Sequence, residues 1–172
     1  MRQIPELENM MIEWFKSAEH IVIVGIGNEL RRDDFVGVRV VKDLRAKVPE
    51  HVMLIESETV PESYIEEIVE FNPSHILLID AGMMGCEPGA AKFIHYDTIL
   101  KTNSAVSTHS LPLRVFCDYL NMTLRTKIAL LIVQPENAGF GEGLNERIEE
   151  AASELKTALL RILQRTKVNK KL

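Results

Sequence analysis

The chain has 172 residues, of which 46% are hydrophobic, and its 20 Lys and Arg side chains against 25 Asp and Glu give a formal charge of −5 at pH 7. A chain of this length buries roughly two-thirds of its unfolded surface, so its stability requires neither a disulfide nor a structural metal. The longest apolar runs fall far short of the roughly 20 residues that a membrane helix needs. We therefore expect one domain over residues 1–172, without membrane insertion.

Charge and the N-terminal residues bear on partners and location. The acidic body argues against a nucleic-acid face, so we expect no nucleic-acid partner. We also expect the protein to be a monomer. Glu6, Glu8 and Glu13 lie where a secretory signal would carry its basic and apolar regions. We expect the protein in the cytoplasm.

The first half of the chain alternates between helical and strand patterns. Apolar residues at helical spacing over 5–17 predict that segment 1–18 contains a helix packed on the body. The run IVIVGIGN predicts a buried strand that ends in a glycine turn. Apolar residues every four positions from Val36 to Val48 predict a helix that begins at Asp33 and Asp34 and ends before Pro49.

The alternation continues to the end of the chain. The sequence predicts the following further elements: a strand at about 51–56, a helix that opens at Pro61, a buried strand at 75–80, an edge strand at 90–95, a helix capped by Ser110, a strand at 127–133, a helix at 144–165 and a basic tail at 166–172. Strands separated by helices of ten or more residues imply βα units. The predicted fold is an α/β three-layer sandwich, in which a twisted, mostly parallel sheet of about five strands is flanked by helices on both faces.

Three polar side chains are expected at the carboxyl edge of this sheet, where such folds bind ligands. Asp34 follows the first strand, Asp80 ends the strand at 75–80, and His109 directly precedes the helix at Ser110. Taken singly, either aspartate of the Asp33–Asp34 pair can be a helix cap. Taken together, two carboxylates and an imidazole suit nickel or zinc with open coordination positions. Two close carboxylates can also act as general acid and base, and the residues leave both chemistries open.

Two further features carry weaker signals. Gly25-x-Gly27 allows either a tight turn or the approach of a substrate backbone, and a dinucleotide fingerprint would need a glycine where Leu30 stands. Cys86 and Cys117 form neither a CxxC pair nor a metal-ligand cluster. We expect both cysteines to be free thiols.

Four motifs occur in an order that resembles the hydrogenase maturation endopeptidases, and most of all the branch serving formate-hydrogenlyase-type and energy-converting NiFe hydrogenases. They are IVIVGIGNELRRDDFVGVRVVKDL, LLIDAGMMGCEPG, STHSLPL and VQPENAGFGEGL, and the resemblance extends from about residue 20 to residue 163. Such enzymes remove a short C-terminal extension from the large-subunit precursor once nickel has been inserted. The resemblance implies an aspartic-type peptidase that has this precursor as its partner.

The resemblance also implies roles for the three polar residues. Asp34, Asp80 and His109 would contact the nickel, which belongs to the substrate, so the protease would carry no permanent cofactor. Whether the nickel polarises the scissile carbonyl or the water, or an aspartate acts as general base, stays open at this stage. A non-catalytic nickel-binding or precursor-binding chaperone with the same ligands is the alternative, and a nucleotide-binding module is a weaker one.

One position departs from the family pattern, because Phe35 stands where a glycine usually follows the acidic pair. A phenylalanine with ordinary dihedral angles is tolerated in the first helical turn, whereas a left-handed position would displace Asp34. We expect ordinary dihedral angles, since Val36 directly begins the apolar stripe. Glu29 and Glu136 also follow strands and are secondary candidates for substrate contact.

Overall fold

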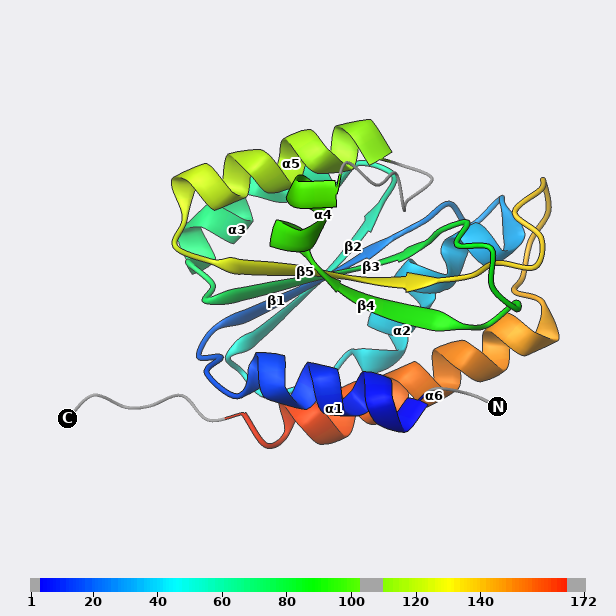
Figure 1. Ribbon diagram of the computed structural model, residues 1–172, viewed down its shortest axis with the longest axis horizontal. Coiled ribbons are helices and arrows are strands. Elements are labelled where there is room, and N and C mark those ends of the chain that lie inside the picture. Colours follow the sequence, from blue (N-terminus) through cyan, green and yellow to red (C-terminus); the bar gives the residue numbers. More distant parts are fainter. Residues whose placement is uncertain (1–3, 103–109, 167–172) are drawn as a thin grey trace.

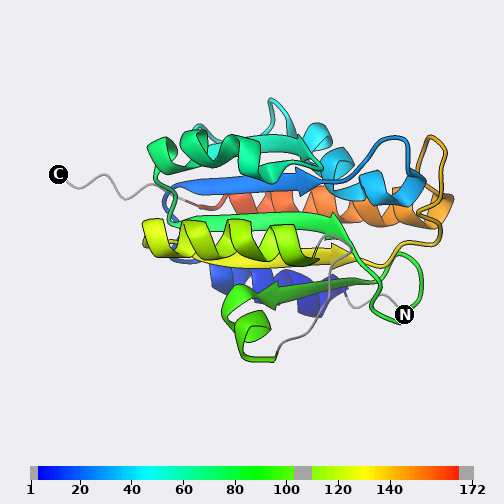
Figure 2. The ribbon, with the colours of Figure 1, turned by 90° about the horizontal axis from the view of Figure 1, so that it is seen from above.

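The computed structural model describes residues 4–102 and 110–166, which form three layers with a sheet in the middle (Figures 1 and 2). The sheet has five strands in the order β2-β1-β3-β5-β4, and only the edge strand β4 is antiparallel to its neighbour. Their bounds are β1 Ile21–Ile26, β2 Val52–Glu58, β3 His75–Ala81, β4 Ala91–His95 and β5 Lys127–Val133. The predicted α/β sandwich is confirmed.

Helices cover both faces of the sheet (Figure 1). One face carries α1 Ile4–Phe15, α2 Val36–Leu44 and α6 Glu146–Leu163; the other carries α3 Ile65–Phe71, α4 Tyr96–Thr102 and α5 Ser110–Thr123. Short 3-10 helices precede two of them, η1 Arg32–Phe35 before α2 and η2 Pro61–Tyr64 before α3. No helix in the described ranges is long and apolar enough to cross a membrane.

Alternate side chains of each central strand enter two separate hydrophobic cores. In β1, Ile21 and Ile23 pack toward α1, α2 and α6, whereas Val22 and Val24 pack toward α3, α4 and α5. Both faces of these strands are buried, which explains why their sequences are continuous apolar runs rather than alternating ones.

Two elements differ from the sequence-based prediction. Helix α2 ends at Leu44 instead of reaching Val48, because Arg45 is extended and Ala46 is left-handed with φ 57°. Val48 still packs against the core from the following turn. Helix α4 was not predicted; its seven residues directly follow β4 and are too few to show a helical period.

The strand order creates a switch point between β1 and β3. The chain leaves β1 for β2 on one side and then crosses to β3 on the other, so the connections that follow β1 and β3 diverge at their carboxyl ends. In folds of this kind, ligands bind at such a point. The parallel register pairs Gly25 with Ile79, which places Asp80 immediately beyond the last pair.

Candidate functional site

Two of the three predicted site residues lie at this switch point. Asp34 belongs to η1, which follows β1, and Asp80 is the penultimate residue of β3; both side chains are buried. The 3-10 helix packs against β3, so the structure brings the two aspartates to one edge of the sheet on neighbouring elements. His109 lies outside the described residues.

Glycines permit this close approach of η1 and α2 to the strand ends. A Cβ atom on Gly27, whose φ is 147°, would lie 1.9 Å from the carbonyl oxygen of Asp34. A Cβ atom on Gly37 would lie 2.0 Å from the carbonyl oxygen of Ile79. Gly25 faces the backbone of Gly37 in the same way. The Gly25-x-Gly27 motif therefore does more than allow the tight turn that the sequence suggested. It also lets the backbone of β1 lie directly against the backbone of η1 and α2.

Backbone amides orient the two buried carboxylates. The amide of Asn28 donates a hydrogen bond of 2.9 Å to Oδ2 of Asp34, and the amide of Ala81 donates one of 2.8 Å to Oδ1 of Asp80. Hydrogen bonds from backbone amides fix the direction in which a carboxylate points. The alternative that the Asp33–Asp34 pair caps a helix is wrong, because neither η1 nor α2 has a side-chain cap.

Asp33 has a different role, which the sequence did not reveal. Its buried carboxylate accepts four hydrogen bonds from the segment between β5 and α6: at Oδ2 from the amides of Glu136 (3.0 Å) and Asn137 (2.7 Å) and from Nδ2 of Asn145 (2.8 Å), and at Oδ1 from the amide of Asn145 (2.7 Å). These partners are 103 to 112 residues away in the chain. Asp33 therefore fixes η1, and with it Asp34, to the β5–α6 loop.

Backbone contacts extend this connection between the two loops. The amide of Arg32 donates to the carbonyl of Gly141 at 2.9 Å, and the amide of Gly141 donates to the carbonyl of Leu30 at 2.8 Å. The Nε of Arg31 donates to the carbonyl of Ala138 at 3.2 Å. The segment VQPENAGFGEGL is thus the partner that holds the β1–η1 loop.

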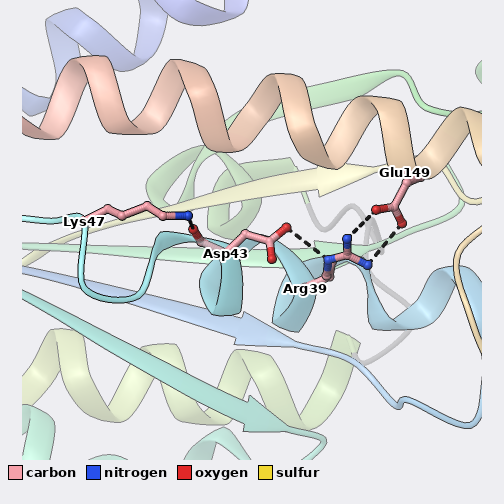
Figure 3. A network of polar contacts seen from close by, with 4 residues as sticks. All are labelled: Arg39, Asp43, Lys47 and Glu149. Carbon is pink, nitrogen blue, oxygen red and sulfur yellow. Dashed lines mark hydrogen bonds and ion pairs between the residues drawn. The ribbon is translucent and has the colours of Figure 1, made fainter.

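An ion-pair network joins the helices that follow these two loops (Figure 3). Arg39 of α2 contacts Asp43 on its own helix, with 3.0 Å between Nε and Oδ2, and both carboxylate oxygens of Glu149 on α6. Lys47 donates to the carbonyl of Asp43 at 2.8 Å. The Arg39 contact with two carboxylate oxygens adds a partly exposed, directional link between α2 and α6, which also pack through buried apolar side chains.

The loop after Asp80 is held by the buried side chain of Gln134, which follows β5. Its Oε1 accepts a hydrogen bond of 2.7 Å from the amide of Met84. Cys86 is half-buried nearby, and Cys117 is buried in α5, where burial raises the pKa of its thiol. Both cysteines are free, as predicted.

The remaining sequence-based candidates lie at the same edge. Phe35 has φ −74° and ψ −3°, so the expectation of ordinary dihedral angles is confirmed, and its side chain is half-buried. Glu29 and Glu136 are exposed on the loops that follow β1 and β5. The described part of the chain holds no cluster of three His, Cys, Asp or Glu side chains arranged for a metal ion. Asp34 and Asp80 can orient a substrate, contact a cation or transfer a proton.

Comparisons with known proteins converge on one family. A family model described as hydrogenase maturation protease matches residues 38–162. A putative hydrogenase maturation protease of Methanocaldococcus jannaschii is 33% identical over 172 residues, covering 95% of this chain and all of the relative. The hydrogenase 3 maturation protease of Escherichia coli K12 is 28% identical over 130 residues, which cover 76% of this chain and 82% of the relative.

Solved structures show the same likeness. The crystal structure of the NiFe hydrogenase maturation protease HycI from Thermococcus kodakarensis has a TM-score of 0.81 at 35% identity, covering 90% of this chain and 99% of that one. The hydrogenase maturating endopeptidase HybD from E. coli has a TM-score of 0.72 at 26% identity, covering 84% and 92%.

Proposed function

Because the chain belongs to the hydrogenase maturation protease family, we propose that it removes the C-terminal extension of a NiFe hydrogenase large-subunit precursor after nickel has been inserted. One observation supports the position of the reaction more than any other. Asp34 and Asp80 come from different elements, yet both are buried at the edge where folds of this kind bind ligands.

In this proposal Asp34, Asp80 and His109 contact the nickel of the precursor, and the protease carries no cofactor of its own. Two carboxylates and an imidazole form a ligand set that suits nickel. The Asn28 and Ala81 amides direct the two carboxylates before the substrate arrives. Contact with the metal then reports that the precursor is loaded, and an empty precursor is bound less well.

Cleavage of the peptide bond needs an activated water and stabilisation of the tetrahedral oxyanion. In an aspartic-type reaction, Asp34 or Asp80 takes the proton of the water while the nickel positions the substrate. In the other assignment, the nickel polarises the scissile carbonyl or the water as a Lewis acid. Both assignments depend on the same aspartates, so removal of either carboxylate stops the reaction.

The test uses single variants in a processing assay with nickel-loaded precursor, followed by intact mass. Asp34→Asn, Asp80→Asn and His109→Ala should each abolish the loss of the C-terminal peptide while circular dichroism stays unchanged. Asp97→Asn, an exposed acid on α4, is the matched control and should process normally. Full activity in any of the three variants removes that residue from the site. Precursor binding without any change in mass would indicate the chaperone alternative.

A further inference from the structure

Four exposed large hydrophobic side chains lie on the loops around the proposed site. They follow the carboxyl ends of β1, β2, β3 and β5 and are, with their exposed fractions, Leu30 (49%), Val60 (44%), Met83 (67%) and Phe140 (85%). We propose that these four residues, the apolar rim, form the docking surface for the precursor segment next to the scissile bond. This inference rests on the proposed function and adds the surface that recognises the substrate.

The grouping of these residues is what distinguishes them from ordinary exposed apolar side chains. Single exposed hydrophobic residues are common on proteins, whereas several at one edge mark an interaction site. Each of the four follows a different strand, so their gathering comes from the fold and not from one apolar stretch of sequence. Asp34 and Asp80 lie at the same edge, so the rim and the proposed site share one edge of the sheet.

The loops hold the rim residues in fixed positions. Leu30 and Gly141, the neighbour of Phe140, are joined by a backbone hydrogen bond of 2.8 Å. In the loop that follows β3, the amide of Gly82 donates to the carbonyl of Val133 at 3.0 Å, directly before Met83. A surface that is ordered before binding loses less conformational entropy when a partner docks.

Leu30 is also connected to the proposed site through one residue. Oδ1 of Asn28 accepts a hydrogen bond of 2.9 Å from the amide of Leu30, while the amide of Asn28 donates to Oδ2 of Asp34 at 2.9 Å. Met83 lies three residues after Asp80. A segment that docks on the rim therefore lies at the edge of the sheet that holds both carboxylates.

Charge indicates the chemistry of that segment. Glu29, Glu136 and Glu142 are exposed on the loops that carry Leu30 and Phe140, and these three acids outnumber the exposed cation of the same loops, Arg31, whose Nε donates to the carbonyl of Ala138. Protein interfaces commonly have an apolar centre and a polar margin whose charges complement those of the partner. The rim therefore fits a precursor segment in which apolar side chains are flanked by Lys or Arg.

The experiment compares Phe140→Ser and the double variant Leu30→Ser/Phe140→Ser with Met122→Ser. Met122 is 88% exposed, but it lies near the C-terminus of α5, which precedes the amino end of β5. We expect KM for nickel-loaded precursor, and the Kd from titration of labelled precursor, to rise at least about tenfold in the double variant. The kcat should stay within about twofold of wild type. The rim would contact the precursor equally in the ground state and the transition state, and loss of such a contact raises KM without changing kcat. Met122→Ser should change neither value.

The outcomes separate this inference from the proposed function. Unchanged KM and Kd in both rim variants overturn the docking surface, even when wild type processes normally. If wild type binds precursor but does not cleave it, and the rim variants weaken that binding, the docking surface is confirmed and the proposed protease function is wrong. If wild type is a dimer by light scattering, and Phe140→Ser dissociates it without weakening precursor binding, the rim binds a second copy and the proposal is wrong.

Discussion

Asp33→Asn tests whether one buried carboxylate holds the site together. The substitution keeps the shape of the side chain, but the amide presents only one oxygen. If that oxygen takes the place of Oδ2, it can still accept from Glu136, Asn137 and Asn145, and the new NH2 group then faces the donating amide of Asn145. One hydrogen bond is lost, and the others no longer end on a charge.

The magnitude follows from hydrogen-bond energies. A bond to a charged group contributes about 1.5–3 kcal/mol and a neutral one about 1 kcal/mol, so we expect Asp33→Asn to lower the free energy of unfolding by about 2–4 kcal/mol. For a chain of this size, each kcal/mol shifts Tm by about 2–4 °C, which predicts a fall of about 5–15 °C. Processing should fall as well, because η1 carries Asp34.

Thermal unfolding followed by circular dichroism is the assay, with Asp43→Asn as control. Asp43 is an aspartate in a partly exposed pair with Arg39, so its loss should cost less than about 1 kcal/mol. Equal Tm values for Asp33→Asn and Asp43→Asn, together with wild-type processing in both, would refute the role given to Asp33.

Two other features of the fold give predictions. Gly37→Ala puts a Cβ atom 2.0 Å from the carbonyl oxygen of Ile79, so we expect it to destabilise by about 2–4 kcal/mol and to reduce processing; a wild-type Tm would show that α2 does not press on β3. Burial, and then the charge of Lys127, lower the pKa of His75 to about 4 from 6.5. Between these two pKa values, His75 is protonated in the unfolded chain and neutral in the folded chain. The burial of neutral His75 therefore contributes fully to stability above pH 6.5, and this contribution is lost as the pH falls toward 4. Between pH 7 and 5, wild type should lose about 1–2 kcal/mol more than His75→Gln in urea unfolding, and equal losses would contradict this.

Features that depend on local pattern and on the general rules of parallel sheets were predictable. The apolar runs that became β1 and β3 predicted buried strands, since only strands covered on both faces are apolar throughout. Carboxyl ends of parallel strands meet at one edge, which is why Asp34 and Asp80 could be placed together. The ordinary dihedral angles of Phe35 followed from the apolar stripe beginning at Val36.

Features that depend on contacts distant in the chain were not predictable from one sequence. The partners of Asp33 are more than 100 residues away, and no spacing in the sequence links Asp33 to Asn145. The glycines of the first motif were recognised as a turn, but their packing against η1 and α2 exists only in the assembled fold. The placement of His109, the monomeric state and the cytoplasmic location stay predictions.

The proposed function requires that this protein cleaves the precursor only after nickel has been inserted. The most direct measurement incubates wild-type protein with nickel-loaded and nickel-free large-subunit precursor and follows both by intact mass. We expect the loaded precursor to lose a single C-terminal peptide while the nickel-free precursor keeps its full mass. Loss of no peptide from either form would contradict the protease function, and equal loss from both would contradict recognition of the nickel.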